Sequence, residues 1–171
     1  MKKITKEWLD THKWFLRTSD GGVSRGGYKR KRVGAWNDAG NKWTGIATCD
    51  ECGGFFGIDE HFNGFGLLFR RTLELCEWRG ERVVVEGDKI CVSSYRVVAV
   101  GADIPAEAFE RCGYRYARDG EKIKAGRWIA VNVSISQSGG DCRMYGNSTN
   151  NQSGGDCYMH GKGCKIVEVK K

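Results

Sequence analysis

A fifteen-residue repeat near the C-terminus places the strongest constraint on how this chain can fold. Residues 132–146 and 147–161 carry Asn, Gln, Ser, Gly, Gly, Asp, Cys, Met and Gly at matching positions of the 15-residue period. A fixed short period indicates that each unit stacks on the next, and this one is too short for a helical hairpin. The repeat therefore predicts two rungs of a narrow β-helix, with equivalent residues about 4.8 Å apart.

Stacked rungs give each repeated residue a place. Small Cys and adaptable Met suit a tight interior, while Asn and Gly suit corners and turns. The expected pairs are Cys142 over Cys157 and Met144 over Met159 inside, Asn132 over Asn147 at a corner, and glycines 139–140 over 154–155 at a turn. The alternative is a disordered polar tail, which Ser, Asn, Gln and Gly also favour.

The chain before the repeat is typical of short strands separated by Gly and Asn turns. The expected strands are residues 67–69, 72–78, 82–86, 89–92 and 95–100, with a hairpin at 86–89. Leu73 and Leu75 alternate with Glu74 and Cys76, which predicts a half-buried antiparallel sheet with the leucines facing inward.

Two short helices complete the expected fold. Apolar residues at helical spacing predict a helix over residues 5–16 with Thr5 as its N-cap, and an early Pro with acidic neighbours predicts a helical turn within 103–110. The fold class is therefore mainly β (α+β). Residues 1–122 would hold the helix, a basic loop and an antiparallel β domain, and residues 123–171 a β-helical extension that strand 127–131 joins to it.

Composition and charge exclude several classes of protein. Six Trp, six Tyr and seven Phe need a core to bury them, which excludes disorder. The sequence has neither a membrane span nor a signal peptide, so we expect a cytoplasmic protein with no membrane partner. The net charge is +7, and Lys and Arg exceed Asp and Glu by eleven to four in residues 1–45. This asymmetry predicts a basic face that attracts acidic or phosphate-bearing partners.

The basic face centres on a segment that combines cations with one aromatic ring and flexible glycines. Cations would meet a phosphate backbone, and the ring would stack on a base. The same cations would also suit an acidic protein surface, and the plain alternative is a solvated strand edge. The candidate contact residues are Arg25, Tyr28, Lys29, Arg30, Lys31 and Arg32.

Eight cysteines are present, and without a secretion signal we expect most of them to be reduced. Cys49 and Cys52 have the spacing of half a zinc knuckle, but the sequence has no second Cys-x-x-Cys to complete it. A pair of reduced cysteines at a strand turn is the favoured interpretation, and we predict no metal site, cofactor or catalytic residue.

Four stretches carry a family resemblance: residues 4–9, the segment from Trp43 through Cys49-x-x-Cys52-Gly-Gly, the hairpin 83–101, and the Gln-Ser-Gly-Gly-x-Cys repeats. In these the chain resembles small bacteriophage and prophage proteins that end in short polar repeats. It departs from them after the Cys-Gly, where Gly-Phe-Phe replaces their Gly-Leu-His. The resemblance implies an inhibitor of host defence in the host cytoplasm, of the anti-CRISPR kind.

A fainter resemblance is to ADP-ribosyltransferase-like folds, in which an early Arg, a Gly-aromatic segment and a late Glu surround the nicotinamide. The matching residues here would be Arg17, Phe55 and Phe56, with Glu107 or Glu110.

Three functions follow from these observations. The first is a non-enzymatic, phage-derived binding protein that inhibits a host-defence nucleoprotein complex, contacting host protein or nucleic acid through its basic N-terminal surface. The second is a virion-associated or self-assembling structural protein that forms homo-oligomers through the repeat. The third is the transferase.

Overall fold

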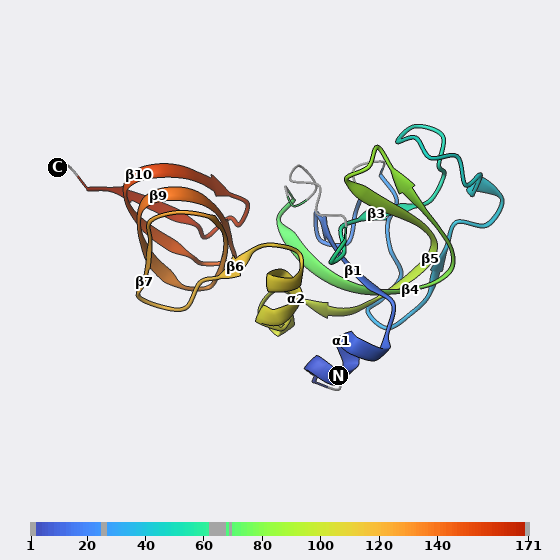
Figure 1. Cartoon of the computed structure of the whole chain (residues 1–171), viewed down its shortest axis with the longest axis horizontal. Coiled ribbons are helices and arrows are strands. Elements are labelled where there is room, and N and C mark those ends of the chain that lie inside the picture. The colour runs from blue at the N-terminus through green and yellow to red at the C-terminus, as the bar shows by residue number, and fades with distance from the viewer. Residues whose placement is uncertain (1–2, 25–26, 62–67, 69, 170–171) are drawn as a thin grey trace.

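The computed structural model describes residues 3–24, 27–61, 68 and 70–169. The fold is mainly β, with an antiparallel sheet in the N-terminal part and a parallel solenoid in the C-terminal part (Figure 1). The elements in chain order are α1 Lys6–Thr11, β1 Trp14–Ser19, β2 Asn37–Asp38, the 3-10 turn Gly40–Lys42, β3 Phe55–Gly57, β4 Thr72–Val85, β5 Lys89–Val100, the 3-10 turn Gly101–Asp103, α2 Ala106–Arg111, β6 Arg115–Tyr116, β7 Glu121–Ile123, β8 Arg127–Val131, β9 Ser134–Tyr145, β10 Thr149–Met159 and β11 Lys165–Glu168.

Both helices begin close to where the sequence predicts them. The Thr5 side chain caps α1 by accepting a 3.2 Å hydrogen bond from the backbone N–H of Trp8, and Pro105 directly precedes α2. The prediction that the first helix reaches residue 16 is wrong, because Trp14–Ser19 pairs along its whole length with β4. Neither helix, nor any other in the described ranges, is long and apolar enough to cross a bilayer.

The N-terminal sheet closes on itself. Its strands follow the order β1-β4-β5-β2, and β3 also pairs with β5. Leu16 of β1 exchanges two backbone hydrogen bonds, of 2.7 and 2.8 Å, with Ile58 just after β3. The predicted hairpin is confirmed, since Glu86 and Gly87 adopt positive φ between β4 and β5. The four strands predicted on either side of this hairpin, 72–78, 82–86, 89–92 and 95–100, form two continuous strands, β4 and β5.

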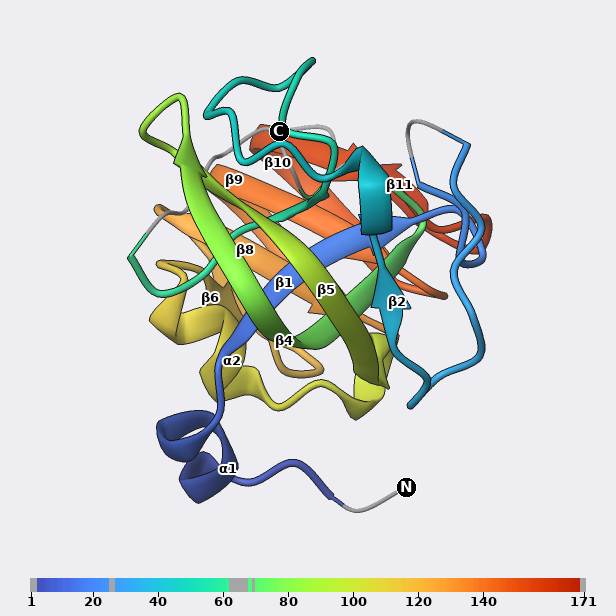
Figure 2. The ribbon, with the colours of Figure 1, turned by 90° about the vertical axis from the view of Figure 1, so that its right-hand side faces the viewer.

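Both faces of β4 are buried over residues 73–76, so the predicted half-buried sheet is wrong there. Leu73 and Leu75 pack in a core shared with α2 and the solenoid, as their alternation predicts. Glu74 and Cys76 face the inside of the closed sheet and are each 0% exposed. The solenoid covers the leucine face, and its strands β8, β9 and β10 lie behind β1, β4 and β5 in Figure 2.

The C-terminal part is a flattened solenoid of parallel strands, which confirms the stacked coil. Equivalent residues of the two copies pair directly, with Cys142 opposite Cys157. Gly140 (φ +72°) lies at a turn where a Cβ would stand 2.7 Å from the carbonyl oxygen of Gly126. The paired strands on the two sides of the coil are β6-β8-β9-β10 and β7-β9-β10-β11.

Parallel pairing begins at Arg115, ahead of the boundary at residue 122 that the sequence suggests, so 127–131 belongs to an earlier coil than expected. The predicted interior is confirmed for Cys142 and Met144, which are both 0% exposed. It is wrong for Met159, which is 51% exposed, because no described strand lies beyond this part of β10. Cys157 lies between these extremes and is half-buried.

One hydrophobic core joins the two parts of the molecule. It combines Leu16 and Leu75 of the N-terminal sheet, Phe109 of α2, and Ile129 and Tyr145 of the solenoid. The Tyr145 hydroxyl also donates a 2.8 Å hydrogen bond to the carbonyl of Leu68, which ties β9 to the segment before β4. The solenoid therefore supports the sheet that carries the basic segment.

Candidate nucleic-acid interface

The basic segment, defined as residues 28–32, is held against the closed sheet by one buried side chain. Asn37 of β2 is 0% exposed. Its Oδ1 accepts hydrogen bonds from the backbone N–H of Lys31 at 2.8 Å and from the Tyr28 hydroxyl at 3.3 Å. Its Nδ2 donates to the carbonyl of Tyr95 at 3.3 Å. Because a buried amide is costly to leave unpaired, these bonds fix where the segment lies.

The loop leading into the segment forms a small hairpin. Isolated bridges join Asp20 to Val23 and Val23 to Lys29, and the Arg30 N–H donates a 2.9 Å hydrogen bond to the carbonyl of Gly22. Of the six predicted contact residues, Arg25 lies outside the described residues.

Arg30 is part of the protein interior. Its Nε donates a 2.7 Å hydrogen bond to Oε1 of Glu74, and its side chain is only 16% exposed. The Ser19 hydroxyl donates to the same oxygen at 2.7 Å, and Arg17 Nε lies 3.4 Å from Oε2. The structure therefore gives this predicted surface cation a structural partner.

Tyr28 is also partly engaged. Its ring packs edge-on against Phe55 with centroids 5.1 Å apart, and 36% of the residue remains exposed. The remaining three candidates, Lys29, Lys31 and Arg32, are exposed and form no ion pair with a described residue. They project from the segment without a salt bridge, and Lys31 is close enough to Asp38 for its charge to help lower the pKa of that carboxyl.

A groove begins where the basic segment ends. It has a volume of about 560 Å³ and runs between α1 and β5. Val33 and Gly34 line one side, and Trp8 and His12, whose rings stack at 4.4 Å, line the other. Arg96 of β5 also lines the groove, and Val33 directly follows the basic segment in the chain.

Sequence reasoning missed a second group of cations and rings. Trp36 lies under two guanidinium groups, those of Arg79 at 4.1 Å and Arg96 at 5.0 Å from the ring centroid. Each cation has an acidic partner, Asp38 for Arg79 and Glu77 for Arg96. Hydrogen bonds from Ser94 and then Arg79 lower the pKa of Asp38, which keeps that carboxylate ionised. In both β4 and β5 an arginine directly follows an aromatic residue, and this sequence pattern could have pointed to the group.

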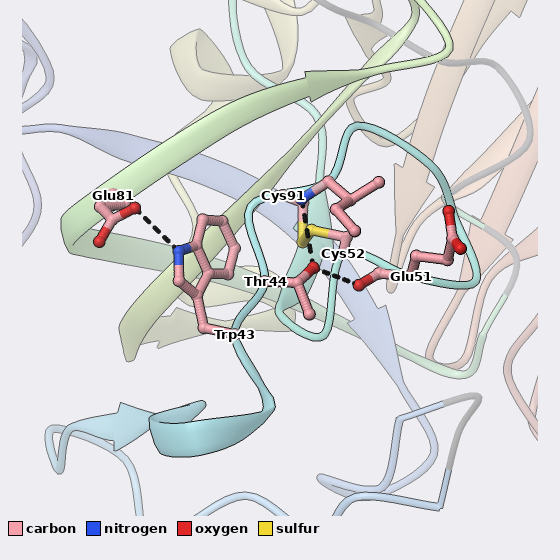
Figure 3. Close-up of a disulfide and its surroundings, with 7 residues drawn as sticks. Trp43, Thr44, Glu51, Cys52, Glu81 and Cys91 are labelled. Atoms are coloured by element: carbon pink, nitrogen blue, oxygen red, sulfur yellow. Dashed lines mark hydrogen bonds between the residues drawn. A yellow bond between two sulfur atoms is a disulfide. The ribbon is translucent and has the colours of Figure 1, made fainter.

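The cysteine predictions need correction. Cys52 is bonded to Cys91 in a disulfide that ties the loop before β3 to β5 (Figure 3). The expected reduced pair at Cys49 and Cys52 is therefore wrong, and the Cys52 sulfur is not free to bind zinc. The other six cysteines are free thiols, as expected for most of the eight. In the part of the chain that the structure describes, no group of three or more His, Cys, Asp or Glu could hold a metal ion.

The residues suggested by the transferase resemblance have local partners of other kinds. Arg17 pairs with Glu74, and the Phe55 ring packs on Tyr95 with centroids 4.6 Å apart. Glu107 lies on α2, where it accepts a 2.9 Å hydrogen bond from Arg111, and Glu110 follows it on the same helix. Transferase activity stays a prediction.

Comparisons of the chain with protein-family models, curated proteins and solved structures gave no significant match.

Proposed function

We propose that this chain is a non-enzymatic binding protein that contacts nucleic acid, free or within a nucleoprotein complex, through its basic segment. The main support is that Lys29, Lys31 and Arg32 are exposed and form no salt bridge with a described residue. Other cations of the same sheet, such as Arg79 and Arg96, are paired with carboxylates. Unpaired cations on a fixed scaffold attract a phosphate backbone and release its counterions.

The groove beside the segment adds to this support. Single-stranded nucleic acid is bound by a cationic track with aromatic rings on which bases stack. Trp8 and His12 supply stacked rings at the groove, and Arg96 supplies a cation at its wall. We therefore favour a single strand over a duplex as the ligand.

The resemblance to small phage proteins gives the partner a class. A protein of that kind would act in the host cytoplasm by occupying the nucleic-acid path of a defence complex. The proposal is accordingly an inhibitor that competes for nucleic acid or covers the surface that binds it.

Binding of a labelled single-stranded oligonucleotide tests the proposal. A triple variant, Lys29→Ser, Lys31→Ser and Arg32→Ser, should bind at least about tenfold more weakly at low salt, because three cations no longer neutralise phosphates of the strand. The matched control replaces three exposed lysines of the solenoid, Lys122, Lys124 and Lys165, by Ser. It removes the same net charge and should bind like the wild type. Equal affinity of the two triple variants would reject the basic segment as the contact.

Self-association through the solenoid is the second candidate function. Four of the six exposed large hydrophobic residues in the described ranges lie in the last coil: Tyr158, Met159, Val167 and Val169. At the opposite end of the solenoid, α2 packs against the first strand: its Phe109 stacks on Tyr116 of β6, with the ring centroids 5.4 Å apart. A strand edge with exposed apolar side chains is a ready site for pairing with another chain.

Sedimentation velocity tests this second candidate. Val167→Lys places a charge on the outer strand and should convert an oligomer to a monomer. Ser136→Lys changes an exposed position of an inner coil and should leave the oligomer intact. A wild type that is monomeric at high concentration would reject this candidate.

A further inference from the structure

We propose that the buried cluster around Arg17 binds a phosphate group. The site is distinct from the exposed cations of the proposed function. Arg17 of β1 lies directly opposite Glu74 of β4, and both side chains face the inside of the closed sheet. Arg30 covers them from the basic segment. The exposed fractions of the three side chains are 7% for Arg17, 0% for Glu74 and 16% for Arg30.

The charges of this cluster do not balance. Two guanidinium groups share one carboxylate, which leaves one positive charge in excess in a place where water is largely excluded. The nearby carboxylate of Asp20 is held by Arg70. No residue outside the described ranges is an Asp or a Glu, so none of those side chains can supply the missing negative charge. A buried charge without a partner is strongly unfavourable, so an anion would stabilise the cluster.

The cluster also has donors without acceptors. Nη1 of Arg17 and the hydroxyl of Tyr95 are buried and form no hydrogen bond. Nε of Arg17 has only the ion pair with Oε2 of Glu74 at 3.4 Å, and that oxygen accepts no hydrogen bond either. The Arg17 guanidinium lies over the Tyr95 ring, 4.8 Å from its centroid, so these groups belong to one site. Buried polar groups in proteins nearly always have a partner, and each exception needs an explanation.

The chemistry of these donors points to a phosphate group. An arginine presents a planar fork of N–H groups that matches two phosphate oxygens. A tyrosine hydroxyl with a pKa raised by burial stays protonated at neutral pH and donates to a third oxygen. A neutral ligand would accept hydrogen bonds from these donors but would leave the excess positive charge uncompensated. A phosphate group would accept the hydrogen bonds and also compensate the charge.

Arg30 lies where such a ligand would enter. It is the more exposed of the two guanidinium groups, and it packs over Gly22, where a Cβ would stand 3.2 Å from its side chain. Arg30 follows Lys29 and precedes Lys31 in the segment that we propose meets nucleic acid. The phosphate could therefore be free inorganic phosphate or the terminal phosphate of a bound strand, and the experiment separates the two.

Thermal unfolding and calorimetric titration of the whole chain with inorganic phosphate test the site. Because a ligand that binds the folded state stabilises it, phosphate should raise Tm more than chloride at equal ionic strength and pH. Arg17→Met should weaken phosphate binding at least about tenfold, since it removes the fork. The matched control is Arg79→Met. The Arg79 side chain is 55% exposed and pairs with Asp38, so this variant should bind like the wild type.

The wild-type protein alone can overturn the proposal. Equal Tm in phosphate and chloride, with no heat of binding, would show that the cluster holds no phosphate, whether or not the Arg17 variant folds. If phosphate binds, oligonucleotides with a 5′-phosphate and with a 5′-hydroxyl identify its source. A preference for the 5′-phosphate that Arg17→Met abolishes supports strand-end recognition, and no preference supports free phosphate. The triple variant of the basic segment should still bind inorganic phosphate, which separates failure of this site from failure of the proposed function.

Discussion

The side chain of Asn132 accepts, through Oδ1, a 2.9 Å hydrogen bond from the backbone N–H of Asn147. These two residues are equivalent positions of the repeat. Asn132 has a φ of 56°, a left-handed conformation that Asn tolerates better than most residues. The corner of one coil is thus bonded to the corner of the next, and the sequence period corresponds to one turn of the solenoid.

Replacing Asn132 by Ala should destabilise the protein by about 2 kcal/mol, because the bond between corners is removed and Ala is strained at positive φ. Asn132→Gly removes only the bond and should cost about 1 kcal/mol. Urea unfolding measures both, with Ser136→Ala as an exposed control. A free energy of unfolding for Asn132→Ala within about 0.5 kcal/mol of wild type would contradict this role of the corner.

The repeat shows both the strength and the limit of sequence reasoning. Only the central coils have the length of the repeat, because there Ser134 pairs with Thr149, one repeat period further along the chain. Arg115 pairs with Trp128, and Thr149 with Lys165, at other spacings. A search for a fixed period therefore finds two coils and misses the shorter and longer ones beside them, although all stack by the same backbone pairing.

Glu74 should be essential for stability. Glu74→Gln leaves Arg17 and Arg30 buried without a negative partner and should cost about 3–5 kcal/mol. The control is Glu77→Gln on the same strand, whose partner Arg96 is 36% exposed, and it should cost about 1 kcal/mol or less. Thermal or urea unfolding distinguishes the two. Equal costs for the two substitutions would mean that the Glu74 pair is no more important than an ordinary surface pair.

The candidate site was only partly predictable for a physical reason. Local composition identified Lys29, Lys31 and Arg32 as cations. It could not show that Arg30 turns inward to Glu74, because that pairing depends on sheet closure between distant segments. The Cys52–Cys91 disulfide was missed for the same reason, since β3 and β5 become neighbours only in the folded sheet.

The disulfide predicts a definite thiol count. Denatured, unreduced protein should react at six cysteines, and reduced protein at all eight. Peptide mapping should find Cys52 joined to Cys91. The Cys91→Ala variant should gain one reactive thiol at Cys52 and lose stability by about 2–4 kcal/mol, because the loop between the two cysteines is no longer closed. Eight reactive thiols without reductant would contradict the disulfide.

Alkylation of Cys157 should persist to lower pH than alkylation of Cys49. A hydrogen bond from the thiol of Cys142 lowers the pKa of Cys157, whereas desolvation raises the pKa of Cys49. Because the thiolate is the reactive form, the rate at each site falls as pH drops through its pKa. Site-resolved mass spectrometry should therefore give Cys157 the lower midpoint. A lower midpoint for Cys49 would contradict the contact between stacked cysteines.

The salt dependence of oligonucleotide binding tests the central proposal most directly. For a single strand, the slope of log affinity against log salt changes by about 0.7 for each phosphate that the protein neutralises. Replacing Lys29, Lys31 and Arg32 by Ser should therefore flatten the slope by about 2 relative to wild type. The solenoid control at Lys122, Lys124 and Lys165 should keep the wild-type slope. A triple variant of the basic segment with an unchanged slope would show that these cations do not contact nucleic acid.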